Sequence, residues 1–446
     1  MSLNLDHRRV WSLAWPMILS NISIPLLGLV DTAILGHLDS PVHLGAVALG
    51  ASILSFVFWG FGFLRMGTTS LVAQAWGRED KLAVNTLFMQ AALLALVLGL
   101  VLIVCKAPLI SLTLELMDPP PEIAVGAAEY SHVRFLSAPA ILFNLTLIGW
   151  FIGLQNTRAP LVMLVTTNLI NIVLDAWFII GLDMGSFGAA LASAIAEACG
   201  SVIGIYLVLR SKLLKPALID WPKVFLLSEY KQLLKLNSHL FLRTACLLFT
   251  FAFFNAQSAQ LGENTLAANA ILFQLLLFVS YGLDGFAHAS EALIGQSVGA
   301  KQRRSFIQAL LTTGAWSVGL TVVFTLLFLL AEPWLITLFT DIETVILELQ
   351  QIYIWILLLP LVSVWAYWLD GVFIGSGQTQ RMLIAMLIAS AGVFFPLWWF
   401  TQHWGNHGLW LAFTVFNLAR GVCLGLQITH IIPPVTAVNG VAHETK

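Results

Sequence analysis

Several amide and ionisable side chains interrupt apolar segments in the first half of the chain. Asp31 lies within IPLLGLVDTAILG, and a later apolar segment carries Asn168, Asn171 and Asp175. Their spacing of i, i+3 and i+7 puts these last three on one face of a helix. An ionisable side chain inside a membrane helix costs at least about 2.5 to 3.5 kcal/mol unless it faces a cavity or a partner. These residues are therefore candidates for binding a cation or a proton.

The candidate residues lie at similar depths below the outer surface of the membrane. Asp31 is about five residues from the outer end of its segment, roughly 8 Å below the surface at the helical rise per residue. Asp175 lies at a similar depth, and Ser193 reaches it from the opposite direction on the next segment. Two carboxylates close together in a low dielectric cannot both ionise cheaply. One would hold a proton, or a cation such as Na⁺ would bind among Asp31, Asn171, Asp175 and Ser193.

Two alternatives stay open for these polar residues. A static interhelical hydrogen-bond cluster would also place amides and carboxylates together, as membrane bundles do. Glu197 lies one turn from Ser193, where it either extends the network, as Asn168 does, or only satisfies a helix contact.

The segment that carries Asp31 also contains Pro16 and Pro25. Each proline removes a backbone hydrogen bond, so this helix can kink. Bending beside a titratable group would couple the protonation of Asp31 to a change of conformation.

A further set of charged residues lies within or beside apolar segments and has two interpretations, lining of a central cavity or pairing across the lobes. The set comprises Arg65, Arg243, Asp284, Glu291, Asp370 and Arg420. The four cysteines and ten histidines show no metal-ligand spacing. No HExxH, Walker A, GxSxG or GxGxxG sequence occurs, so we expect no resident cofactor, no metal centre and no enzyme activity. A membrane-embedded hydrolase or a scaffold is the alternative from a different class.

Composition defines the elements that hold these residues. Of 446 residues, 59% are hydrophobic and 10% are charged, and the mean hydropathy is +0.89, whereas soluble domains are about 25% charged. Apolar segments long enough to cross a bilayer recur along the whole chain. The sequence predicts an all-α polytopic membrane protein with twelve helices, near 10–36, 44–72, 83–104, 130–153, 160–181, 186–209, 236–260, 265–297, 306–329, 349–374, 382–402 and 407–430.

Lysine and arginine alternate between the loops. Most lie at the N-terminus or in every second loop, and Lys106 is the exception among loops of the other set. Cytoplasmic loops carry this excess of positive charge, so we expect both termini in the cytoplasm. The net charge of −2 gives no basic surface for nucleic acid.

The two halves of the chain repeat each other at an offset of about 222 residues. Gln74 and Gly77 recur as Gln296 and Gly299, and Gly149 recurs as Gly371. Six helices per repeat give both halves the same orientation, with a cavity between them. We predict an N-terminal lobe at 1–209, a cytoplasmic linker at 210–235 and a C-terminal lobe at 236–446.

Five segments carry a family resemblance that spans the whole chain: WPMILSNISIPLLGLVDTAILGHLDSP, LRMGTTSLVAQAWG, RFLSAPAILFNLTLIGWFIGLQNTRAP, NLINIVLD and GAALASAIAE. They resemble the multidrug and toxic compound extrusion (MATE) family, above all its DinF branch. The resemblance implies a V-shaped fold and cation-coupled export of amphipathic, often cationic, drugs or toxic compounds by alternating access. It also implies a multi-pass protein of a bacterial inner membrane that works as a monomer in the lipid bilayer.

The resemblance gives individual positions a role. The coupling aspartate matches Asp31, the bending proline matches Pro16, the helix 5 pair matches Asn171 and Asp175, and the helix 6 hydroxyl matches Ser193, where threonine is more usual. We favour H⁺ as the coupling ion. The alternatives are a Na⁺-coupled exporter and a lipid-linked oligosaccharide flippase, which would need several basic residues in its cavity.

Overall fold

Helices make up almost all of the regular structure. The computed structural model describes residues 6–36 and 41–434, without the side chains at positions 26, 29, 31–33, 35 and 41. Within these ranges the elements are α-helices with short π and 3₁₀ segments, and no strand occurs. The predicted all-α fold is confirmed.

The helices of the first half correspond to six membrane crossings, two of which are broken. Between α2 and α3 the chain turns at Phe61 and Gly62, and α5 and α6 form one crossing bent by 52° at Ser137. Pro139 sits in the first turn of α6, where its missing N–H costs no helical bond. The elements are α1 (His7–Gly36), α2 (Pro41–Gly60), α3 (Phe63–Gly77), α4 (Lys81–Met117), α5 (Pro121–Leu136), α6 (Ala138–Gly153), α7 (Arg158–Asp175) with the π-helix η1 (Ala176–Gly181), and α8 (Gly185–Ser211).

The second half follows the same order after a short helical connection. That connection contains η2 (Pro216–Leu218), α9 (Trp221–Phe225) and η3 (Leu227–Tyr230), and the next helix begins at Lys231, five residues before the predicted start. The remaining elements are α10 (Lys231–Gln260), α11 (Glu263–Gly299), α12 (Arg303–Leu330), α13 (Glu332–Phe339), α14 (Glu343–Ile352), α15 (Ile354–Gly375), α16 (Thr379–Leu387), η4 (Ile388–Phe394), α17 (Phe395–Thr401), η5 (Gln402–Trp404), α18 (Asn406–Gly425) and η6 (Ile428–His430).

Length and composition fit a membrane-spanning bundle. In the described ranges, ten helices are long and apolar enough to cross a membrane, or eleven with the bent pair α5 and α6 as one span. The 30-residue α1 completes a set of twelve. Val104 and Leu330 are each 81% exposed, which suits contact with lipid rather than water.

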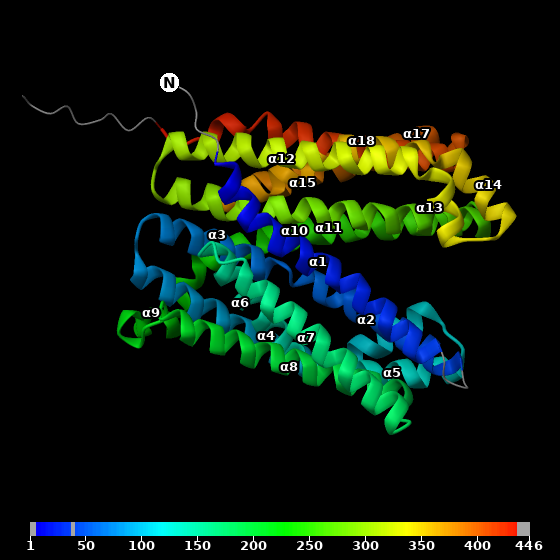
Figure 1. The fold of residues 1–446 in the computed structure, drawn as a ribbon, viewed down its shortest axis with the longest axis horizontal. Helices are drawn as coiled ribbons and strands as arrows, with labels where there is room; N and C mark the ends of the chain where they lie inside the picture. Colours follow the sequence, from blue (N-terminus) through cyan, green and yellow to red (C-terminus); the bar gives the residue numbers. More distant parts are fainter. Residues whose placement is uncertain (1–5, 37–40, 435–446) are drawn as a thin grey trace, which may run out of the picture.

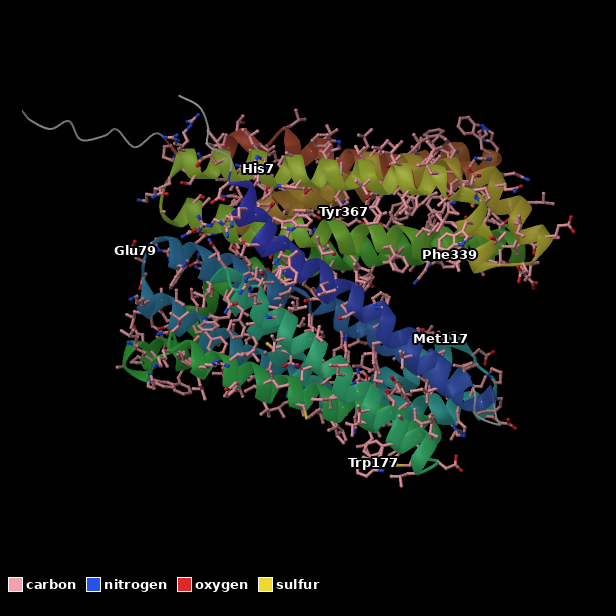
Figure 2. The ribbon with its side chains drawn as sticks, viewed as in Figure 1. His7, Glu79, Met117, Trp177, Phe339 and Tyr367 are labelled. Atoms are coloured by element: carbon pink, nitrogen blue, oxygen red, sulfur yellow. The ribbon has the colours of Figure 1, made fainter. Side chains whose placement is uncertain are left out.

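The twelve helices form two lobes that lie side by side (Figure 1). The elements α2 to α8 occupy the lower lobe in that view and α10 to α18 the upper one, while α1 packs against both α7 and α11. We call the end of the molecule that carries Arg78, Lys81 and Lys301 the basic end. His7 and Glu79 lie toward this end, and Met117, Trp177 and Phe339 lie toward the opposite end (Figure 2).

Matched glycines show that the two lobes repeat each other in three dimensions. A Cβ atom on Gly149 would lie 2.5 Å from the carbonyl oxygen of Arg65, and one on Gly371 would lie 2.4 Å from that of Ala287. Both pairs follow the offset of about 222 residues. The packing of α6 on α3 is therefore reproduced by the packing of α15 on α11.

The same register governs the contact between the lobes at the basic end. There α3 meets α11, and a Cβ on Gly77 would lie 2.1 Å from the carbonyl oxygen of Gln296. Its counterpart, Gly299, would place a Cβ 2.0 Å from the carbonyl oxygen of Gln74. Only glycine allows backbones to approach this closely. The lobes are thus in direct backbone contact at the basic end.

Candidate functional site

Asp31 lies in α1, about five residues before the helix ends at Gly36. Its side chain falls outside the described part of the structure. Its predicted approach to Asp175 therefore stays a prediction, whereas the other candidate side chains are described.

Asn171 and Asp175 form a buried pair on α7. The Nδ2 of Asn171 donates to Oδ2 of Asp175 at 2.7 Å, and the two residues are 3% and 1% exposed. Asp175 is the last residue of α7, immediately before the π-helix η1. π-helical turns are rare and often occur at functional sites. The spacing inferred from sequence thus does bring this pair together.

Asn168 binds a different partner from the one its helical face suggested. Its Nδ2 donates to Ser23 Oγ at 3.0 Å and to the Ser23 carbonyl at 3.3 Å, which ties α7 to α1. Two residues farther along α1, Pro25 interrupts the backbone ladder. On the other side of the same turn, Asn21 Nδ2 donates to the Tyr281 carbonyl of α11 at 3.3 Å. The proline-containing part of α1 is therefore hydrogen-bonded to both lobes.

Ser193 and Glu197 lie one turn apart on α8 and are partly buried. No hydrogen bond joins Ser193 to Asn171 or Asp175 among the residues with described side chains. Glu197 accepts a hydrogen bond at Oε2 from Asn144 Nδ2 of α6 at 2.9 Å. Sequence reasoning did not single out Asn144, although an amide within an apolar helix is a signal for such a contact.

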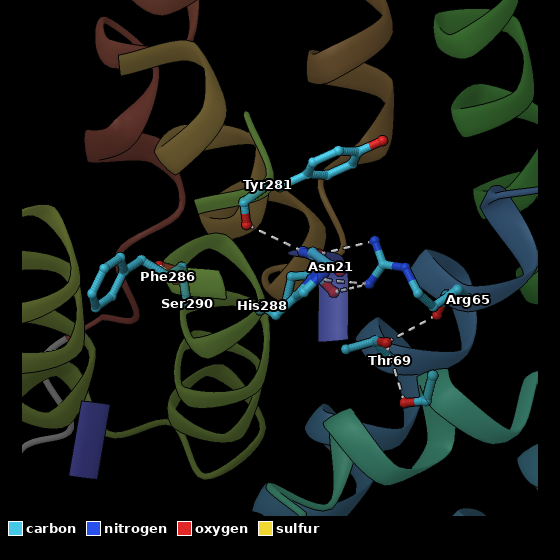
Figure 3. A network of polar contacts seen from close by, with 9 residues as sticks. Asn21, Arg65, Thr69, Tyr281, Phe286, His288 and Ser290 are labelled. Carbon is cyan, nitrogen blue, oxygen red and sulfur yellow. Dashed lines mark hydrogen bonds and ion pairs between the residues drawn. The ribbon is translucent and has the colours of Figure 1, made fainter. Parts of the chain in front are cut away.

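An ion pair joins the lobes on the side of the bundle nearer the basic end. Arg65 of α3 donates to Oε2 of Glu291 on α11 at 2.9 Å, and His288 lies 3.2 Å from both partners. The side chains of Arg65 and Glu291 are 13% and 2% exposed. We call these three residues the inter-lobe network. Figure 3 shows Arg65 reaching toward His288, with Asn21 and Tyr281 beside them.

A second buried charge group lies wholly within the second lobe. Arg243 of α10 and Arg420 of α18 both donate to Oδ2 of Asp370 on α15, the latter at 2.8 Å. Arg420 also donates to Asn417 and lies over the ring of Phe416. We call Arg243, Asp370 and Arg420 the Asp370 cluster. Pairing across the lobes is therefore found for Arg65 with Glu291, whereas the Asp370 cluster pairs within one lobe.

The basic end is held closed by further polar contacts between the lobes. Gln74 Nε2 donates to the Gly375 carbonyl at 3.0 Å, and Arg9 donates to Gln155 and to Gln296 at 2.6 and 2.9 Å. A polar cavity of about 260 Å³ lies beside Arg9 between α1, α3, α11 and α12. At the opposite end, α7 and η1 pack on α1 and α8 of the first lobe. The structure is thus closed at the basic end.

Across the described ranges, no group of three or more His, Cys, Asp or Glu side chains is arranged to hold a metal ion. The four cysteines are free thiols.

Comparisons with known proteins agree with this architecture. The MatE family model matches residues 16–177 and 240–400, one match in each lobe. The DNA damage-inducible protein F of Escherichia coli (strain K12) is 41% identical over 423 residues, which cover 95% of this chain and 92% of that protein. A probable multidrug resistance protein NorM of Bacillus anthracis is 27% identical, with 92% of each chain covered.

Solved structures show the same fold. A MOP superfamily transporter from Pyrococcus furiosus superposes with a TM-score of 0.86 at 21% identity, covering 95% of this chain and 96% of that one. A crystal structure of MATE in the bent conformation gives 0.84 at 22% identity, with 95% of both chains covered. Given the paired family match and the full-length relative, the chain belongs to the MATE family of multi-pass membrane transporters and resembles its DinF members.

Proposed function

We propose that this protein is a proton-coupled antiporter that exports amphipathic, often cationic, organic compounds. The proton would be carried in the first lobe by Asp31 and Asp175, with Asn171 and Ser193 completing the site. The observation that carries this proposal is the buried Asp175 carboxylate, which receives an amide hydrogen bond from Asn171. An amide orients a carboxylate without neutralising it, so the group can exchange a proton.

Two carboxylates of the second lobe differ from Asp175 in their partners, which supports a coupling site in the first lobe. Its carboxylates Asp370 and Glu291 are bound by arginines, and a carboxylate paired with guanidinium strongly favours its charged form. Such groups suit a structural role. We therefore propose coupling in the first lobe, with Na⁺ at the same four residues as the competing version.

We further propose that the basic end faces the cytoplasm of a bacterium, as the excess of lysine and arginine there favours. The structure, closed at this end, then corresponds to the outward-facing state of a monomer in the inner membrane. Substrate loading would require α3 and α11 to separate and the inter-lobe network to break. Movement of one proton down a 100 mV potential supplies about 2.3 kcal/mol, to which a pH gradient adds.

Transport in proteoliposomes tests the proposal. With a pH gradient imposed, the wild type should exchange a lipophilic cation for protons, and Asp31→Asn should abolish this exchange while the protein stays folded by circular dichroism. Normal exchange by Asp31→Asn would refute the site. Replacing all Na⁺ with choline should leave the wild-type rate unchanged, whereas loss of transport in choline would replace the proton with Na⁺.

A further inference from the structure

Glu197 lies where three helices of the first lobe meet. Its backbone carbonyl and its carboxylate both accept from Asn144 Nδ2, at 3.0 and 2.9 Å. Ser201, one turn along α8, donates to Asn144 Oδ1 at 2.9 Å and so fixes the orientation of the amide. The α7 helix closes the group, because a Cβ on Gly200 would lie 2.5 Å from Thr167 Oγ1. The carboxylate is therefore held in a defined place by its neighbours.

Among the residues that the structure describes, no basic side chain forms an ion pair with this carboxylate. Two arginines within the membrane-spanning helices of this lobe have other partners: Arg65 pairs with Glu291, and Arg134 donates to Ser137. A neutral amide supplies no positive charge to an acidic side chain within a membrane helix. A cationic ligand can supply that charge.

One oxygen of the carboxylate is available for that ligand. Oε2 is taken by Asn144, whereas Oε1 accepts no hydrogen bond from the described residues. Oε1 is also absent from the buried polar atoms that have no partner, so it is accessible. The side chain is partly buried, which strengthens its attraction for a cation relative to a surface carboxylate.

Glu197 lies at a different depth from the coupling residues. Thr167 is level with Gly200, as their contact shows, and Asp175 follows Thr167 by two turns of α7. At the helical rise per residue, Glu197 lies roughly 7 Å closer to the basic end than Asp175. A cation at Glu197 and a proton at Asp175 therefore occupy separate places.

We propose that Glu197 recognises the positive charge of organic substrates, such as quaternary ammonium or phosphonium ions and protonated amines, and thereby sets the preference for cations. This inference rests on the proposed export function and adds the residue that selects the substrate. Asn144 acts as a positioning residue, since it orients Glu197 without touching the substrate.

Equilibrium binding to the purified full-length protein tests the inference apart from coupling. Tetraphenylphosphonium and tetraphenylborate have nearly the same shape and opposite charges, so they separate charge recognition from apolar contact. In Glu197→Gln the dissociation constant for tetraphenylphosphonium should rise about tenfold or more, because a charged partner is replaced by a neutral one. Binding of tetraphenylborate should be unchanged or tighter. Glu197→Asp keeps the charge and should retain most of the preference for the cation.

A matched control removes the same charge from the same lobe. Glu129 is exposed on α5, and Glu129→Gln should leave binding of both ions unchanged. Equal weakening of both ions in Glu197→Gln, or no change for either, would overturn the inference. The Asn144 amide also binds the backbone carbonyl of residue 197, so Glu197→Gln should fold normally.

The proposed function can fail independently. A wild type that binds the cation through Glu197 but shows no exchange driven by a pH gradient would overturn proton coupling and leave the inference standing. Exchange that persists in Glu197→Gln with unchanged affinity for the cation would overturn the inference about Glu197 and leave proton coupling standing.

Discussion

The two lobes share a backbone plan but treat their buried carboxylates differently. In the first lobe, Asp175 and Glu197 accept from the amides of Asn171 and Asn144. In the second lobe, the Asp370 carboxylate forms ion pairs with both arginines of its cluster. The opposite-end half of that lobe is packed with aromatic rings, among them Phe254, Phe273, Trp410 and Phe413. Repetition of the fold therefore supplies two equivalent frames, in which these buried carboxylates have different partners.

Neutralising one carboxylate in each lobe tests this difference between the lobes most directly. Asp175→Asn should abolish pH-driven exchange in proteoliposomes with little loss of stability, because asparagine keeps the shape of the pair. Asp370→Asn should instead destabilise the fold by about 3 to 5 kcal/mol, since it leaves two buried guanidinium groups without their anion. Thermal unfolding in detergent would measure the second effect.

Asp183→Asn is the control for the first substitution. Asp183 is exposed, with φ at +52°, a conformation that asparagine tolerates. Transport by Asp183→Asn should equal that of the wild type. Full activity of Asp175→Asn, or loss of coupling without loss of stability in Asp370→Asn, would reverse the assignment of the lobes.

The inter-lobe network offers a second test, because the repeat does not preserve it. The counterparts of Arg65 and Glu291 at the repeat offset are Ala287 and Thr69. Arg65→Ala removes the guanidinium partner of the buried Glu291 carboxylate and leaves it only the contact with His288 among the contacts described above, so it should cost the closed state about 3 to 5 kcal/mol. Spin labels at the exposed positions 79 and 301, one on each lobe, should then report a longer separation.

Exchanging the two charges separates the ion pair from general packing. The double variant Arg65→Glu with Glu291→Arg should recover much of the short separation. Wild-type distances in the single variant would mean that the pair does not hold the lobes together.

The matched glycines at the basic end should respond alike, in contrast to the carboxylates. Gly77→Ala and Gly299→Ala each place a methyl group against a backbone carbonyl of the other lobe. Each should weaken the closed state by about 1 to 3 kcal/mol, as overpacking does. Gly319→Ala, which has open space around its Cβ, should have no such effect. The separation of spin labels at positions 79 and 301 would measure this effect. Clearly unequal separations in Gly77→Ala and Gly299→Ala would show that the two glycine contacts do not contribute equally.

The smallest expected effect concerns the orientation of Asn144. Ser201→Ala removes the hydroxyl that donates to Asn144 Oδ1, a loss of about 1 kcal/mol. Affinity for tetraphenylphosphonium should fall by a factor of about five or less. A loss as large as that of Glu197→Gln would assign Ser201 a direct role in binding.

Much of the fold follows from the sequence because its determinants are local. Long apolar segments fix the helices, and the spacing within α7 brings Asn171 to Asp175. Contacts between distant segments depend on helix packing, which composition does not encode. Asn168 shares a helical face with Asn171 but turns to Ser23 on α1. The partner of Glu197 comes from α6, and that of Arg65 lies 226 positions away.

The seal between α3 and α11 has a consequence for its response to pH. At Gly77 and Gly299 it consists of backbone against backbone, so no titratable side chain takes part in the closest contact. Protonation of carboxylates leaves these backbone contacts in place, whereas it acts on the Arg65–Glu291 pair between the same two helices. The closest contact of the seal is therefore independent of the ionisation of side chains.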